Sequence, residues 1–349
     1  MVRRFDKGPG SLIYETPTWR ILTVASRRWV AVVSLFLACC VPSLGVAASF
    51  DCGKAKTRFE RTVCADPELS AQDTAMGKRY DAALPLLSDA GQTILRTGQG
   101  QWLKVANVLC VVNKRDESPS TCLQRQYADR LGNLRSAAVP MGPFVLSRSD
   151  TYASSGKETG TGRPFEQHTS VPRIDQPLSP LAEQWNAAMV RWAAAQRVKQ
   201  CFGDTQTPGD QFLDFKVQAA MPGFINVEMT RIEECDGQAA DEEVTNVSYL
   251  LHPALHPLAA ADVFKPGSGW ETFLDRRASK ALGADGEIFF ADGINKRVRD
   301  PQAWSFTAQG LLISFNPGDA TAIATGVVHV TVPWADLTHF IASNAPIPH

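Results

Sequence analysis

Six cysteines beyond residue 50 constrain the fold of this chain more than any other feature of the sequence. No C-x-x-C pair occurs, and no histidine stands near a cysteine at metal-ligand spacing. In an exported protein, an even set of this kind predicts disulfides. The first four allow three pairings, and we favour neighbour pairs because a helix end and the next helix start can meet across a hairpin. The favoured pairs are Cys52 with Cys64, Cys110 with Cys122 and Cys201 with Cys235.

The N-terminal region predicts export. Arg27 and Arg28 precede an apolar stretch from Trp29 to Leu44, which ends in the small residues Gly45-Val46-Ala47-Ala48. A basic, then apolar, then small-residue order is typical of a signal peptide, here residues 1–48. The alternatives are an uncleaved anchor helix and a lipoprotein site at Cys39. We therefore expect a periplasmic or secreted protein that meets the membrane only if its signal is retained.

Residues 49–135 have the periodicity of a small helical domain. Pro67 separates a short first helix from a second, and Leu84-Pro85 marks the next break. A third helix is predicted from Thr93 to Cys110, where apolar residues repeat at helical spacing. A polar turn, Asn113 to Ser120, leads to a fourth helix over residues 122–134.

The remaining sequence changes character twice. Residues 136–177 are rich in Gly, Ser, Thr and Pro, which predicts a linker that ends in a first strand near residues 167–174. Residues 178–349 mix both element types: alternation over 213–219 and 225–229 predicts a hairpin, a helix covers 270–282, and strands follow near 311–315 and 327–332. The expected fold is a small disulfide-stapled all-α domain followed by an α+β domain, with an antiparallel or mixed sheet packed with helices.

Charge is unevenly distributed although the formal net charge is only −1, which argues against a general nucleic-acid binder. Residues 49–135 carry 13 basic and 10 acidic side chains, and residues 136–349 carry 16 basic and 24 acidic ones. One acidic run contains no Lys or Arg. It would steer a strongly basic partner, or it is simply a solvated loop. Its members are Glu233, Glu234, Asp236, Asp241, Glu242 and Glu243.

Catalytic signatures are lacking in the sequence. It has no Gly-x-Ser-x-Gly elbow, no His-Glu-x-x-His and no Gly-x-x-x-x-Gly-Lys loop. His252 and His256 are each followed by proline, which disfavours a helical metal site. His329 fits the solvent face of a strand, and Trp102, Trp185 and Trp192 fit a core. We expect no enzyme, no metal and no cofactor, although a carboxylate pair that acts on a glycan stays open as an alternative.

The order of motifs in residues 49–135 resembles the N-terminal domain of LprI-type lysozyme inhibitors. The resemblance implies an exported, disulfide-stapled helical module and, for some members, lysozyme binding. A candidate for the contact, because two cysteines close its base, is the turn between the third and fourth cysteines, at Asn113, Lys114, Arg115 and Asp116. The matching positions include Asp51-Cys52, Glu60, Cys64-Ala65-Asp66-Pro67-Glu68-Leu69, Asp73, Tyr80, Gln101-Trp102-Leu103, Cys110, Cys122-Leu123, Tyr127, Arg130 and Leu134.

Residues 178–341 resemble, more weakly, the extracytoplasmic domain of RsiV-type proteins, which sense lysozyme. The sequence departs from that pattern in two places, because Gly318 and Ile323 stand where tyrosines are usual and residues 236–240 lack a histidine. The matching pieces are Ala261-Asp262-Val263-Phe264, Trp270, Leu274, Gly310-Leu311, Phe315-Asn316-Pro317, Ala324-Thr325-Gly326 and residues 330–337. The sequence therefore predicts an exported bacterial envelope protein that binds lysozyme. The alternatives are an envelope-stress or cell-wall accessory protein with another ligand and a glycan-acting enzyme.

Overall fold

The structure is a computed structural model that describes residues 48–113, 117–154, 164–196, 209–235, 240–283 and 290–348. All of them belong to one compact unit, Leu44–His349. The predicted signal peptide lies outside the described residues except for Ala48. No helix in the described part of the chain has both the length and the apolar character that a membrane span requires.

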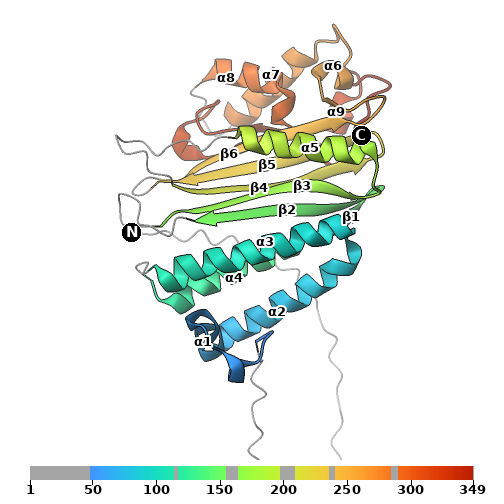
Figure 1. The fold of residues 1–349 in the computed structure, drawn as a ribbon. Coiled ribbons are helices and arrows are strands. Elements are labelled where there is room, and N and C mark those ends of the chain that lie inside the picture. Colours follow the sequence, from blue (N-terminus) through green and yellow to red (C-terminus); the bar gives the residue numbers. More distant parts are fainter. Residues whose placement is uncertain are drawn as a thin grey trace, which may run out of the picture. The chain divides into compact units, whose positions relative to one another are not determined.

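Four helices form the N-terminal part (Figure 1), and local capping explains where they begin. Asp66 is extended and caps the second helix, which starts with Pro67. Ser88 and Ser118 cap the third and fourth helices in the same way. The predicted breaks are confirmed. The helices are α1 (Arg58–Ala65), α2 (Pro67–Ala83), α3 (Asp89–Asn107) and α4 (Pro119–Leu134), and a π-helix, Val108–Val112, extends α3.

Two disulfides fasten these helices. Cys52 is bonded to Cys64 and Cys110 to Cys122, with Cα–Cα distances of 5.7 and 5.4 Å, so both predicted pairs are confirmed. Cys235 is disulfide-bonded too. Its predicted partner, Cys201, lies outside the described residues.

A seven-stranded sheet follows the helices in the order β1-β2-β3-β4-β5-β6-β7. Neighbours are antiparallel except for β3 and β4, which run parallel and are separated in sequence by helix α5 (Pro180–Ala195). The sheet is therefore mixed, within the predicted fold class. The strands are β1 (Ala138–Met141), β2 (Phe144–Ser154), β3 (Glu166–Gln176), β4 (Asp210–Met221), β5 (Phe224–Glu234), β6 (Asp241–Leu250) and β7 (His256–Pro257).

The prediction of a linker over residues 136–177 is wrong for most of its length. The predicted strand near residues 167–174 is confirmed as β3, but β1 and β2 also fall in this region. Polar side chains of β2 are buried against other polar groups, so the strand lacks the apolar alternation by which a half-buried strand is recognised. The Gly- and Ser-rich residues 155–163 lie outside the described residues.

A second, three-stranded sheet has the order β10-β9-β8. Its core contains Trp304, whose ring meets the rings of Phe264 and Trp270 edge-on at 5.4 and 5.7 Å. The predicted helix near 270–282 and the two late strands are confirmed. The elements are α6 (Ala260–Val263), α7 (Trp270–Gly283), α8 (Ala291–Val298), β8 (Trp304–Phe306), β9 (Gly310–Phe315), β10 (Val328–Pro333) and α9 (Trp334–Leu337).

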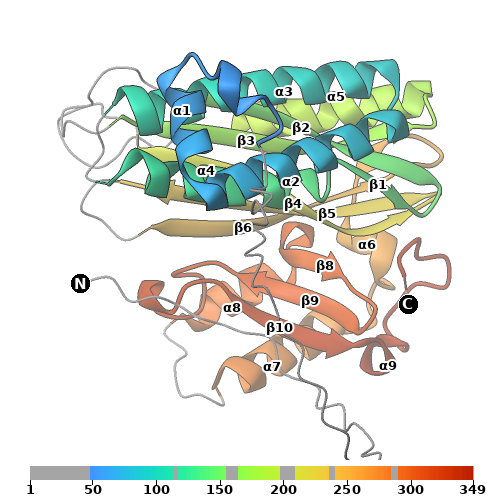
Figure 2. The same ribbon diagram turned by 90° about the horizontal axis from the view of Figure 1, so that it is seen from below.

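The large sheet uses its two faces differently. Helix α5 packs on an apolar face, where Trp185 is buried in a cluster with Val227 and Met229. The alternating residues on the other face are more polar. On β2 and β3 they meet α3 and α4, whereas on β5 Asn226 donates to the Trp304 carbonyl of β8. The helices α1–α4 and the β8–β10 module therefore occupy different strands of the sheet, as Figure 2 shows.

Candidate functional site

The turn between α3 and α4 is the first predicted contact region. Cys110 lies in the π-helix, and Cys122 lies in the first turn of α4, so the disulfide closes the base of the turn. Arg58 of α1 supports it by donating to the Val111 carbonyl at 3.3 Å. Val112, the last residue of the π-helix, is an apolar side chain that is 63% exposed. Asn113 is described, but Lys114, Arg115 and Asp116 lie outside the described residues.

The start of α4 is bound to the start of α2. Ser120 and Gln124 both donate to the carboxylate of Asp66. The hydrogen bond from Ser120 is the largest of the effects that lower the pKa of Asp66, and the backbone amides of Leu69 and Glu68 act in the same direction. The turn therefore stands on a base in which α1, α2 and α4 are tied together.

The acidic run, the second predicted region, is partly neutralised by an arginine that precedes it. Glu233 is buried at the end of β5 and pairs with Arg231 at 2.8 Å, and Arg231 also pairs with Glu243 of β6. Glu234, Asp241 and Glu242 are exposed. Asp236 lies outside the described residues. The sequence did not indicate which acids are paired and which are exposed. The pairing depends on the register of β5 and β6, which brings Arg231 next to Glu243.

Both predicted regions lie at the same end of the large sheet. Gln126 of α4 donates to Glu166 at the start of β3 at 2.8 Å, and the Glu166 amide donates to Asp210 at the start of β4 at 2.6 Å. In the strand register, Asp210 of β4 lies opposite Glu234 of β5, and Glu233 of β5 lies opposite Asp241 of β6. We call this group the acidic end. It comprises Glu166, Asp210, Glu233, Glu234, Asp241, Glu242 and Glu243.

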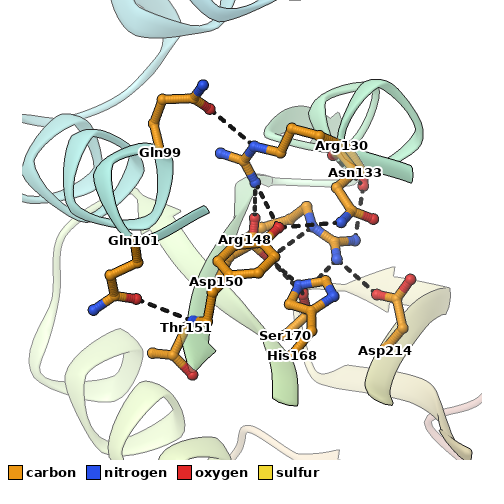
Figure 3. A network of polar contacts seen from close by, with 12 residues as sticks. Gln99, Gln101, Arg130, Asn133, Arg148, Asp150, Thr151, His168, Ser170 and Asp214 are labelled. Carbon is orange, nitrogen blue, oxygen red and sulfur yellow. Dashed lines mark hydrogen bonds and ion pairs between the residues drawn. The ribbon is translucent and has the colours of Figure 1, made fainter. Parts of the chain in front are cut away.

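A buried polar network joins the helices to the sheet (Figure 3). Its centre is Asp150 of β2, which pairs with Arg130 of α4 at 2.6 Å and with Arg148 of β2 at 3.2 Å. Arg148 reaches on to Asp214 of β4 at 2.7 Å. Gln99 of α3 accepts from Nε of Arg130 at 2.9 Å. Four elements are therefore connected by one set of charge-assisted bonds.

Ser170, His168 and Asp150 have the residue types of a catalytic triad but not its arrangement. Ser170 donates directly to Asp150, and Nε2 of His168 lies 3.0 Å from Ser170 Oγ and 3.6 Å from the same carboxylate. A triad needs the acid on the other imidazole nitrogen, so that the histidine stands between acid and nucleophile. All three side chains are buried, and the His168 ring is stacked on Tyr152 at 4.2 Å. The group is therefore a structural cluster.

The remaining predicted residues have ordinary positions. Trp102 and Trp185 are buried in cores, as predicted. His329 is exposed on β10, also as predicted, with Nδ1 3.1 Å from Ser314 Oγ. His256 lies in the short strand β7, which provides no helical face shared with His252. The described residues contain no group of metal-ligating side chains.

Sequence reasoning missed the role of Arg148 and Asp150 and did not assign one to Gln101 and Arg130. The signal that was available is the spacing of two in Arg148, Asp150 and Tyr152, which places the three side chains on one face of a strand.

The electrostatics of Asp150 predict acid sensitivity. Burial by itself raises the pKa of this carboxyl, but the neighbouring His168 imidazole and the charges of Arg148 and Arg130 outweigh it and hold the pKa well below its usual range. A folded-state pKa below the unfolded value of about 3.9 gives stability that is complete above that value and lost as the pH falls through the folded value. The free energy of unfolding should therefore decrease on acidification below about pH 4.

The check is urea unfolding of the native protein and Asp150→Asn at a series of pH values from about 6 down to 2. The variant should be less stable near neutral pH and show a shallower decrease below about pH 4, because it no longer takes up this proton. Parallel curves for the two proteins would contradict the assignment.

These features define a class of protein. A disulfide-stapled module of four helices packs on the large mixed sheet of an α+β domain, and that sheet also carries the small sheet β8–β10 with its helices. Residues 51–137 match the family described as lysozyme inhibitor LprI, and residues 261–335 match a family of proteins of unknown function, DUF3298. The first match spans the segment from the first disulfide through α4, and the second spans most of the β8–β10 module with its helices. The chain therefore carries an LprI domain followed by a DUF3298 domain. Together with the disulfides, the LprI domain indicates an extracellular or envelope protein.

Similar solved structures are distant. A DUF3298 family protein from Pseudomonas aeruginosa PAO1 is similar over 59% of this chain and 98% of its own, with 12% identity and a TM-score of 0.41. A DUF3298 family member from Bacteroides fragilis is similar over 58% and 96%, with 13% identity and a TM-score of 0.40. No curated protein matches the chain.

Proposed function

We propose that this is an exported bacterial envelope protein that binds lysozyme and inhibits it stoichiometrically, with no enzymatic reaction of its own. The observation that carries the proposal is the LprI domain at residues 51–137, since lysozyme inhibition is the property for which that family is described. The resemblance of the C-terminal part to RsiV-type sensors supports the same ligand. The signal-like residues 1–48 support export.

The acidic end and the α3–α4 turn are the proposed contact surface. Val112, the last residue of the π-helix before the turn, supplies an exposed apolar side chain. The Cys110–Cys122 disulfide closes the base of the turn, which reduces the conformational freedom lost when a partner binds. The acidic end supplies negative charge beside it. A strongly basic enzyme would be steered toward this end, and the turn would then block its substrate cleft.

The first test is a titration with hen-type lysozyme. The chain from Ser49 to His349, with its disulfides intact, is titrated calorimetrically while residual lysis of bacterial cell walls is measured in parallel. We expect saturable binding and loss of lysis near a ratio of one to one. The whole chain is needed because separation of the domains would leave Arg130 and Asp150 without their buried partners.

Charge at the acidic end should control the rate of association. Neutralising three exposed acids together, Glu234→Gln, Asp241→Asn and Glu242→Gln, should lower the association rate at low salt roughly three- to tenfold and flatten its salt dependence. Dissociation should change little, because exposed charges act mainly on encounter. Stopped-flow or surface-based kinetics at two salt concentrations measures both rates.

A matched control removes the same charge elsewhere. Asp81→Asn on α2, Glu183→Gln on α5 and Asp275→Asn on α7 together also neutralise three acids, but none belongs to the acidic end. If both triple variants slow association equally, net charge is responsible and the acidic end is not the contact surface.

Val112→Ser tests the α3–α4 turn separately. It should raise the dissociation rate, and an unchanged dissociation rate would remove the turn from the interface.

The second candidate function is that of an envelope accessory protein with a different ligand. It rests on the DUF3298 match at residues 261–335, a part of the chain that the lysozyme-inhibitor match at residues 51–137 does not cover. A folded protein that binds no lysozyme in the titration would place this candidate first. Turnover of a cell-wall glycan that stops when one Asp or Glu is neutralised would instead establish an enzyme.

A further inference from the structure

The edge of strand β2 that faces away from β3 is covered partly by strand β1 and partly by helix α3. β1 pairs only with residues 144–147 of β2, and the strand continues to Ser154. Beyond β1, the amide of Tyr152 and the carbonyl of Asp150 are directed away from β3, because backbone groups alternate between the two sides of an antiparallel strand. An open edge of this kind is a template for pairing with another chain. Here helix α3 lies along it.

Two residues of α3 contact the backbone of this edge. Oε1 of Gln101 accepts the hydrogen bond of the Tyr152 amide at 3.1 Å, as a neighbouring strand's carbonyl would. Gly98 lies one turn earlier, where a Cβ atom would come within 3.0 Å of the Asp150 carbonyl oxygen. The helix therefore approaches the strand backbone to a distance that only glycine permits without a shift.

Side chains of α4 recognise the same stretch of strand. Nη1 of Arg130 donates to Asp150 at 2.6 Å and to the Tyr152 hydroxyl at 3.0 Å, and Asn133 donates to that hydroxyl at 3.3 Å. The two helices together provide an acceptor for a strand amide, room for a strand carbonyl and a cation for a strand carboxylate. These contacts fit an edge strand that carries an acid and, two residues later, a tyrosine, because they involve both the backbone and the two side chains of that strand.

We propose that the α3–α4 face formed by Gly98, Gln101 and Arg130 is a strand-recognition surface that holds β2 of its own chain and keeps the edge of β2 from pairing with a second copy. A second copy is the competing partner because each copy carries the same stretch, residues 148–154. Among the described strands this stretch pairs with β3 alone, so its other edge would be open without α3. The proposal does not depend on lysozyme binding.

Two glycines of α3 provide the test. Gly98→Val places methyl groups against the Asp150 carbonyl, whereas Gly100→Val makes the same change where a Cβ meets nothing within 4 Å. Hydrogen exchange of the Tyr152 amide in the full chain should be faster by at least about tenfold in Gly98→Val and unchanged in Gly100→Val. Light scattering after size exclusion should show concentration-dependent dimers for Gly98→Val alone.

A second pair of variants covers the case in which Gly98→Val fails to fold. Gln101→Leu removes the acceptor and should accelerate exchange at Tyr152, and Gln101→Glu keeps an oxygen in place and should restore slow exchange. Equal exchange in Gln101→Leu and the native protein would overturn the strand-recognition role. Faster exchange in a protein that stays monomeric at high concentration would overturn the role in preventing self-pairing.

Discussion

Replacement of Asp150 by alanine is expected to lower the free energy of unfolding by about 3–5 kcal/mol, a large part of the stability of a typical protein. Asp150 and Arg130 are almost fully buried, with side chains that are 5% and 0% exposed, and Arg148 is 3% exposed. Without the carboxylate, two guanidinium groups stay desolvated while their main counter-charge is gone. The penalty is therefore the uncompensated burial of charge and exceeds the worth of the hydrogen bonds alone.

Urea unfolding at neutral pH measures this loss, and an exposed ion pair is the control. Asp336 pairs with Arg277 at 2.6 Å, but both side chains are about 40% exposed. Asp336→Ala should therefore cost only about 0–1 kcal/mol, although the pair is equally short. A loss at Asp150 as small as that at Asp336 would mean that water reaches the network.

A combined replacement tests the reason for the loss. Arg130→Met, Arg148→Met and Asp150→Leu together remove all three charges and leave apolar groups of similar size. Replacing a buried ionic group in this way is often close to neutral, so the triple variant should be more stable than Asp150→Ala by itself. The opposite order would show that the network contributes net stability through its hydrogen bonds.

Removal of the Cys110–Cys122 disulfide is expected to have the second-largest effect on the free energy of unfolding. The unfolded chain loses a cross-link, which costs about 3 kcal/mol, and the space left at the buried site costs roughly 1 kcal/mol more. Both sulfurs belong to buried residues, 5% and 1% exposed. Alanine at these positions removes the cross-link and also leaves unfilled space at the point where α3 and α4 meet.

The other disulfide is a control with the same loop length. Cys52 and Cys64 are also separated by 12 residues, so the loss of chain restriction is the same in the two double-alanine variants. Cys52 is exposed and Cys64 half-buried, so little packing is lost there. Urea unfolding under non-reducing conditions should rank the 110–122 variant as the less stable one. A reversed order would contradict the role of burial.

The helical half could be predicted from the sequence because its signals are local. A capping residue or a proline acts within one turn, so Pro67 marks the start of α2 without knowledge of the rest of the fold. The polar turn before α4 is likewise a local signal, although α4 begins at Pro119, three residues before the predicted start. Neighbour pairing of the four cysteines follows from the same local arrangement of helix ends. The apolar spacing around Trp102 likewise identifies a buried face.

The sheet was harder to predict where its partners are polar. On β4 and β5 apolar alternation marks the hairpin, but on β2 the inward residues are Arg148, Asp150 and Tyr152. Their burial depends on Arg130, which lies about 20 residues away in another element. The apolar alternation that would indicate a strand is therefore missing from β2, and the Gly, Ser, Thr and Pro content of residues 136–177 favours a linker instead.

The sequence by itself determined the breaks between the helices, two disulfides, the α+β class and the likeness to lysozyme inhibitors. Each of these depends on residues that are close together along the chain or on motifs in a fixed order. Only the tertiary structure decided that the helical module is docked on the sheet and that the acidic run and the α3–α4 turn lie at one end. It also decided that Arg231 holds two of the acids. These relations depend on which distant segments meet, and a buried ion pair or a covered strand edge exists only after they have met.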